Sequence, residues 1–111
     1  MEWTVAIGVD THRDVHVAVA VDRVGVQVDS REIETTEAGY RSLLSWALGL
    51  GAPVFAVEGA GSYGAGLVRF LECADVAVYE CERPRRQERR RGKSDLIDAA
   101  LPRDGRSPAR G

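Results

Sequence analysis

Four acidic residues stand where predicted strands end and where a predicted helix begins. Asp10 and Glu58 each follow an apolar run, while Asp95 and Asp98 are three residues apart, the spacing that places two side chains on one face of a helix. Clustered carboxylates repel one another unless a cation compensates them, and Mg²⁺ prefers oxygen ligands of this kind. The four acids therefore form a candidate site for Mg²⁺, or for Mn²⁺ in its place.

The chemistry that such a site supports is phosphoryl transfer. Two metal ions about 3.5–4 Å apart can activate a water or hydroxyl and stabilise the leaving oxygen. Each acid also has a purely structural interpretation: Asp10 can cap a turn, Glu58 can mark a strand end, Asp95 suits the positive end of a helix dipole, and Asp98 can pair with an arginine. As an ordered set, the four acids favour a catalytic metal site.

A basic segment precedes Asp95. Residues 1–81 hold 5 Lys and Arg against 12 Asp and Glu, a net charge of −7, whereas residues 82–111 hold 10 against 5, a net charge of +5. A basic run next to a metal site can hold a phosphate backbone, and the alternative is a solvated charged terminus. The run begins at Arg83, and we expect nucleic-acid contacts from Arg85, Arg86, Arg89, Arg90, Arg91 and Lys93.

The remaining polar motifs allow two interpretations each. The glycine-rich stretch 59–64 could admit a phosphate backbone, but it lacks the Gly-Lys-Ser/Thr ending of a phosphate loop and also suits a tight turn before a helix capped by Ser62. His12 could touch substrate near Asp10 or be a surface histidine. His16 alternates away from the valines around it. Cys73 and Cys81 have no metal or redox spacing and are expected to be reduced thiols.

The elements that must position these groups follow from hydrophobic periodicity. Residues 4–9 form an apolar run typical of a buried strand. Valines recur at every second position from Val15 to Val21 and, after a polar break at residues 22–23, again from Val24 to Val28. Two alternating runs around a short break predict a hairpin.

Helices and two further strands complete the expected order. Thr35 or Thr36 can cap a helix that ends at Gly49 or Gly51. Strands are predicted at residues 53–57 and 76–79, with a helix around residues 67–71 between them. The order β-β-β-α-β-α-β predicts an α/β fold in which the first, fourth and fifth strands are parallel and the hairpin lies at the edge. It is the order of the ribonuclease-H-like fold, whose beginning the actin-like ATPases share.

Length and composition suit one small domain. The chain has 111 residues, 44% of them hydrophobic and 29% charged. No apolar run approaches the ~20 residues that cross a bilayer, and the start lacks the features of a signal peptide. We therefore expect no membrane association and a cytoplasmic location.

Three short segments around the acids stand in a fixed order. They are Val9-Asp10-Thr11-His12 with Asp14 nearby, Val57-Glu58-Gly59-Ala60-Gly61-Ser62-Tyr63-Gly64, and Gly92-Lys93-Ser94-Asp95-Leu96-Ile97-Asp98-Ala99. In this order they resemble the opening motif, the glutamate motif and the closing Lys-x-Asp-x-x-Asp-Ala motif of the DEDD transposases of the IS-one-ten (IS110) family of insertion sequences. The resemblance covers residues 4–100.

The resemblance implies a RuvC-like domain over residues 1–100, a mixed sheet with flanking helices, that binds Mg²⁺ through Asp10, Glu58, Asp95 and Asp98. It implies a role in DNA transposition and recombination, by an oligomer guided by a structured bridge RNA. Transposases of this family continue with a long helical region and a second domain carrying a nucleophilic serine. Here the chain ends thirteen residues after Asp98, and Pro102 interrupts the helix. We expect a truncated domain with a disordered, aberrant tail at residues 101–111, inactive alone.

Two other functions compete with a metal-dependent recombinase. The chain could be a non-catalytic fragment that binds full-length transposase, or its DNA or RNA, and inhibits it. It could also be half of an actin-like ATPase, because an Asp-Thr pair after the first strand can meet phosphates. The ATPase fold needs a second phosphate loop and a second domain, and the sequence contains neither. No organic cofactor is expected.

Overall fold

A five-stranded sheet with two helices makes up the part of the chain described by the computed structural model, residues 2–81. The elements are β1 (Val5–Thr11), β2 (Val15–Asp22), β3 (Gln27–Glu34), α1 (Glu37–Leu50), β4 (Pro53–Glu58), α2 (Ala65–Cys73) and β5 (Val78–Cys81). Their order along the chain is the predicted β-β-β-α-β-α-β.

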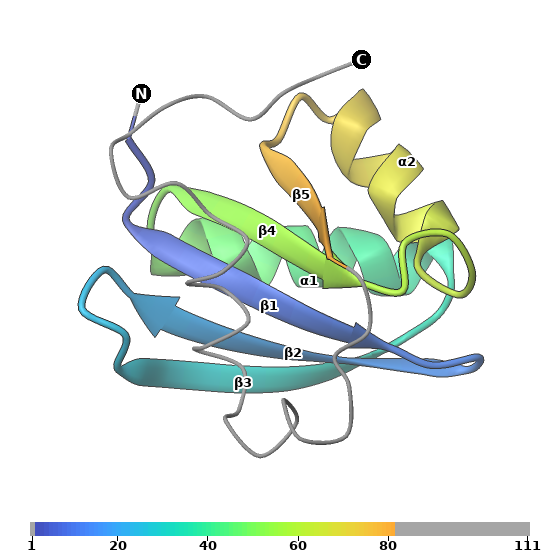
Figure 1. The fold of residues 1–111 in the computed structure, drawn as a ribbon, viewed down its shortest axis with the longest axis horizontal. Coiled ribbons are helices and arrows are strands. Elements are labelled where there is room, and N and C mark those ends of the chain that lie inside the picture. The colour runs from blue at the N-terminus through green and yellow to red at the C-terminus, as the bar shows by residue number, and fades with distance from the viewer. Residues whose placement is uncertain (1, 82–111) are drawn as a thin grey trace.

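The sheet is mixed, with the strand order β3-β2-β1-β4-β5. β1 pairs in parallel with β4, and β4 with β5, whereas β2 is antiparallel to both β1 and β3. Both parallel connections pass through a helix (Figure 1). This confirms the ribonuclease-H-like fold and places β1 at the centre of the sheet.

Both helices cover the same face of the sheet. Side chains alternate along a strand, and in β1 the residues Val5, Ile7 and Val9 lie in one buried cluster with Leu43 of α1 and Leu67 of α2. In Figure 1, α1 runs behind the sheet. The main core therefore lies between the sheet and the helices.

The central strands are apolar on both faces. Ala6 of β1 belongs to a second buried cluster on the opposite face, together with Val54 and Ala56 of β4. Burial on both faces explains why β1 and β4 read as continuous apolar runs rather than as alternating ones.

The valines of β2 do not face the helices. His16, Ala18 and Ala20 are fully buried, and the two alanines lie in the cluster beneath the helices, whereas Val19 packs in the cluster on the opposite face. Small alanine side chains leave room for α1 to approach the sheet. His16 is thus a buried residue on the helix-covered side.

Two strands lie later in the chain than expected. The predicted strand over Val24–Val28 is wrong in its bounds, because Asp22 Oδ1 accepts hydrogen bonds from the amides of Val24 and Val26, both at 3.0 Å, and closes a turn there. β3 therefore starts at Gln27 and continues to Glu34 as an exposed edge strand. The last strand starts at Val78 rather than Val76, because the Val76 amide still donates to Leu71 at the end of α2.

The start of α1 follows the prediction. Thr36 is the N-cap, its side chain accepting a hydrogen bond of 3.1 Å from the amide of Gly39, and the helix ends before Gly51. Trp46 attaches α1 to the edge strand, since its indole N–H donates to Asp29 Oδ2 at 2.9 Å. This hydrogen bond lowers the pKa of the Asp29 carboxyl.

Gly39 is expected to resist substitution. A Cβ atom there would overlap the carbonyl oxygen of Glu34, so the helix must shift to accept it. Gly39→Ala should destabilise the fold by about 1–3 kcal/mol, although alanine is the better helix former. Gly49→Ala, in the same helix with open space around it, should instead stabilise the fold by up to about 1 kcal/mol. Urea unfolding of both variants measures the contrast, and equal effects would contradict the packing.

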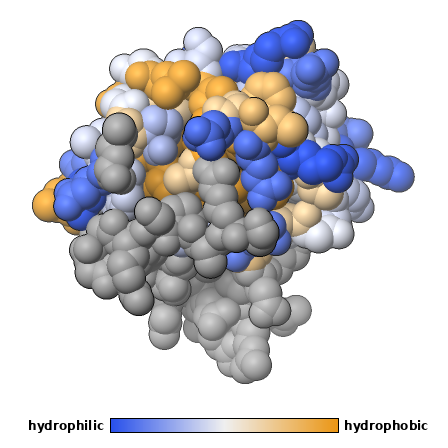
Figure 2. Space-filling model, turned by 90° about the horizontal axis from the view of Figure 1, so that it is seen from above, coloured by the Kyte–Doolittle hydropathy of each residue, from blue (hydrophilic) through white to orange (hydrophobic). Residues whose placement is uncertain are grey.

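No helix within residues 2–81 is long and apolar enough to cross a membrane. Over the described surface seen in Figure 2, hydrophobic and hydrophilic residues are interspersed. Large hydrophobic side chains that are exposed include Val24, Val26, Val28, Leu48, Leu50 and Tyr63. Scattered exposed residues of this kind are ordinary for a protein surface.

Candidate metal site

Asp10 and Glu58 lie directly beside each other in the sheet. They are register partners in the parallel pair β1–β4, at the carboxyl ends of both strands. Neighbouring strands are about 4.8 Å apart, so the two side chains leave the backbone within reach of one shared ion. The sequence prediction that these acids meet at one edge of the sheet agrees with this placement.

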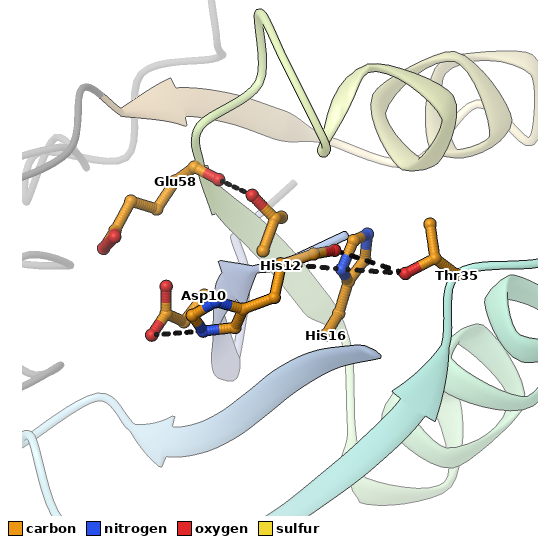
Figure 3. A network of polar contacts seen from close by, with 6 residues as sticks. Asp10, His12, His16, Thr35 and Glu58 are labelled. Carbon is orange, nitrogen blue, oxygen red and sulfur yellow. Dashed lines mark hydrogen bonds and ion pairs between the residues drawn. The ribbon is translucent and has the colours of Figure 1, made fainter. Parts of the chain in front are cut away.

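Both carboxylates also lie on the same face of the sheet. By alternation they continue the rows of Ala6 and of Val54 and Ala56, on the face opposite the helices. Figure 3 shows the two carboxylates directed to the same side, away from His16 and Thr35. The side chain of Asp10 is 30% exposed, and Glu58 is buried at 5%. Burying a carboxylate costs free energy unless hydrogen-bond donors or a cation compensate its charge. The buried position of Glu58 therefore suits a ligand of a cation.

Thr11 fixes the backbones of the two acids relative to each other. Its buried hydroxyl donates to the carbonyl oxygen of Glu58 at 2.7 Å, across the β1–β4 pair. A buried hydrogen bond between the residue after one acid and the carbonyl of the other holds the two strand ends in register.

The glycine-rich stretch forms the turn from β4 into α2. Gly59 has a φ of 72°, in the left-handed region, and its carbonyl accepts from the amides of Ser62 and Gly64. A Cβ at Gly64 would come within 3.0 Å of Val57 Cγ1 and 3.1 Å of Thr11 Cγ2. These glycines thus serve a tight turn packed against the site.

Ser62 does not cap the helix, as had been expected. The N-cap of α2 is Gly64, without a side-chain hydrogen bond, and the Ser62 hydroxyl donates to the Gly59 carbonyl at 3.3 Å. The expectation was wrong because the turn is two residues longer than the sequence pattern indicated.

Two histidines follow Asp10 in the chain: His12 contacts its carboxylate, and His16 is buried in a position that the sequence did not reveal. His12 Nε2 is 3.4 Å from Asp10 Oδ2, and the His12 side chain is 57% exposed, in keeping with a surface histidine near the acids. His16 is fully buried, and its Nδ1 accepts from the His12 amide at 3.4 Å. Its ring also stacks on Tyr40, with centroids 6.2 Å apart. Alternation placed His16 opposite the valines but could not say which face the helices cover.

His16 is expected to make folding stability depend on pH. Burial lowers the pKa of the His16 imidazole from 6.5. Well above pH 6.5 the ring is neutral in both the folded and the unfolded chain. Below it, the unfolded chain takes up a proton that the folded chain resists, so the free energy of unfolding falls with falling pH.

The measurement is urea unfolding between pH 7 and pH 5 for the wild type and for His16→Phe. The variant should lose part of the decline in stability over this range, because its buried ring does not titrate. Since His12 and the carboxylates are common to both proteins, an identical decline in both would contradict the assignment.

The described residues contain half of the predicted metal-binding set. Asp10 and Glu58 fit a hard divalent cation, because they are paired oxygen donors on one face at one sheet edge. Within residues 2–81, no group of three or more His, Cys, Asp or Glu side chains is placed to hold a metal ion. Asp95 and Asp98 lie outside the described residues. The site proposed from the sequence thus needs ligands beyond residue 81.

Also outside the described residues are the tail 101–111 and the predicted nucleic-acid contacts Arg85, Arg86, Arg89, Arg90, Arg91 and Lys93. Cys73, which is exposed, and Cys81, which is half-buried, form no disulfide with each other, in agreement with the sequence analysis.

Comparison with known protein families identifies a matching family. The family model of the DEDD transposase domain of IS110 elements, described as a transposase, matches residues 7–101. The match begins in β1, includes Asp10 and Glu58 and extends over the segment with Asp95 and Asp98. No curated protein matches the chain.

Proposed function

Because the chain belongs to the IS110 family of DEDD transposases, we propose that it is a metal-dependent domain that cuts and transfers DNA strands. Its metal ligands are Asp10, Glu58, Asp95 and Asp98. The domain runs through about residue 100, in keeping with the span of the family match.

The observation that carries this proposal is the pairing of Asp10 with Glu58. Parallel neighbours at the carboxyl edge of an α/β sheet are where such folds place their sites. When bound there, Mg²⁺ or Mn²⁺ would activate a water or hydroxyl and stabilise charge on phosphate oxygens. The protein's part is to hold two carboxylates in fixed register, which the strand pairing and the Thr11 hydrogen bond accomplish.

The partners proposed are nucleic acids and further transposase subunits. Family membership supports DNA as a substrate. The basic residues between 83 and 93 would bind the phosphate backbone, and their charge suits the bridge RNA of such elements as well as DNA. Association into a homo-oligomer, or with a full-length transposase, is part of the same proposal.

The test is cleavage of supercoiled and branched DNA by the full chain in Mg²⁺ or Mn²⁺. In keeping with the sequence analysis, we expect no complete transposition by the chain alone. What we expect it to retain is nicking at the metal site, which EDTA abolishes and added Mg²⁺ restores. DNA or RNA binding without cleavage, together with inhibition of an active relative mixed with the chain, would instead support a regulatory fragment. ATP binding without binding of nucleic acid would contradict both the metal-dependent transposase domain and the regulatory fragment.

A further inference from the structure

We propose that His12 orients the Asp10 carboxylate toward the metal, and that His16 and Thr35 hold His12 in position. The inference rests on the proposed function, because it assigns positioning residues to the same site. It concerns residues that all lie in the described part of the chain, in the polar network of Figure 3.

The first link is the contact between His12 and Asp10. His12 Nε2 lies 3.4 Å from Asp10 Oδ2. A carboxylate on a short side chain can rotate about its last bond, and a donor at one oxygen restricts that rotation. In metal sites, hydrogen bonds and ion pairs to a ligand from residues that do not touch the metal orient that ligand and affect the metal affinity.

The second link holds the backbone of His12. Its amide donates to the carbonyl of Val15 at 3.1 Å and to His16 Nδ1 at 3.4 Å. Its carbonyl accepts from the Thr35 hydroxyl at 3.4 Å, and the Thr35 amide is tied to the carbonyl of Asp14 at 3.0 Å. Residues from β2 and from the loop before α1 thus fix both backbone polar groups of His12.

The third link is the burial of His16. Its ring is fully buried and stacks on Tyr40. Nδ1 accepts from the His12 amide and also lies 3.4 Å from the Thr35 hydroxyl, whereas the buried Nε2 has no hydrogen-bond partner among residues 2–81. An unpartnered buried nitrogen lowers stability, so an apolar ring of this size would suit the core better. What the histidine adds over such a ring is the Nδ1 acceptor beneath His12.

The test compares Mn²⁺ affinity, by calorimetry on the full chain, in variants that remove or retain each contact. His12→Leu should weaken Mn²⁺ binding about tenfold. That is the lower end of the range of effects seen when a residue that supports a metal ligand is replaced. His12→Gln can still donate to Asp10 from its amide and should bind within about twofold of wild type. Since the His12 side chain is 57% exposed, neither variant should alter thermal unfolding appreciably.

A matched pair at His16 tests the anchor. His16→Phe keeps the stacked ring and removes the acceptor, so Mn²⁺ binding should weaken although the protein stays folded. His16→Asn keeps an acceptor oxygen near the position of Nδ1 and should retain affinity better than His16→Phe. Thr35→Val against Thr35→Ser repeats the comparison at a residue outside the core, in case the His16 variants unfold.

A second readout needs no metal. In the ¹⁵N NMR spectrum of the metal-free chain, the His12 Nε2 resonance should shift in Asp10→Asn and stay unchanged in Glu80→Gln. Wild-type Mn²⁺ affinity in His12→Leu, or a His12 resonance indifferent to Asp10→Asn, would overturn the positioning role and leave the metal site intact. Failure of the wild type to bind Mn²⁺ at all would overturn the proposed function together with this inference.

Discussion

Asp10→Asn and Glu58→Gln are each expected to slow metal-dependent DNA cleavage by about a thousandfold or more. Each change keeps the size of the side chain and removes one negative charge from the pair at the end of β1 and β4. A metal ion supplies several kcal/mol of charge stabilisation in phosphoryl transfer, and each 1.36 kcal/mol corresponds to a factor of about ten in rate. The measurement is the initial rate of nicking at saturating Mg²⁺, with circular dichroism to show that each variant is folded.

Glu80→Gln is the matched control for the acid substitutions. Glu80 lies on β5, the strand that pairs with β4. By alternation its side chain is on the opposite face of the sheet from Glu58. The same loss of charge there should change the rate less than twofold, since the side chain is exposed and outside the site. A Glu58→Gln variant that is folded and as active as Glu80→Gln would show that the pair is not catalytic.

Phe55→Ala is expected to remove about 3–5 kcal/mol from the free energy of unfolding. Phe55 is fully buried at the centre of β4, paired with Ile7 of β1 and Val78 of β5. Truncating it leaves a cavity between the sheet and the helices. Because a small domain has only about 5–15 kcal/mol in total, the variant should be largely unfolded in moderate urea.

Val28→Ala is the control for the core substitution. Val28 is 51% exposed on the edge strand β3, so its truncation should change stability by less than about 0.5 kcal/mol. Urea titrations followed by tryptophan fluorescence and circular dichroism compare the two. Equal midpoints for Phe55→Ala and wild type would contradict the position of Phe55 in the core.

Continuous apolar runs were the most informative part of the sequence. Residues 4–9 and 53–57 carry apolar side chains at nearly every position, which indicates burial on both faces, and the acids that end them fall side by side in the sheet. The predicted cap at one of the two threonines, which is Thr36, was confirmed, as was the β-β-β-α-β-α-β order. Both predictions rest on strong local signals in the sequence.

Edge strands and turns were predicted less well. β3 is an edge strand, exposed at nearly every position, and most of its residues are polar. The hydrophobic alternation therefore ended at Val28, whereas the strand continues to Glu34. The turn before it depends on the Asp22 side chain and on the positive φ of Gly25. Neither feature appears in a hydrophobic pattern.

The environment of the histidines could not be predicted from the sequence. Alternation placed His16 and the valines of β2 on opposite faces, but both faces of the strand suit a core. Only the positions of α1 and α2 decide that the alanines and His16 are covered. The hydrogen bond that links His16 to His12 joins residues on either side of a turn, whose geometry hydrophobicity does not encode.

In the proposed function, the central strand positions the metal site. β1 is held on both sides, by β2 and by β4, and its buried residues anchor it beneath the helices. Its end therefore presents Asp10 from a rigid element, next to Glu58, while the turn after it brings His12 back to the same carboxylate. The proposed site, built on strand ends, would need little rearrangement to receive a cation.

The most direct test of the metal site is calorimetric titration of Mg²⁺ and Mn²⁺ into the purified full chain and into the double variant Asp10→Ala/Glu58→Ala. Saturable binding by the wild type that the folded double variant loses is the expected result. Equal affinity in both proteins, or no binding by the folded wild type, would contradict the assignment of Asp10 and Glu58 as metal ligands.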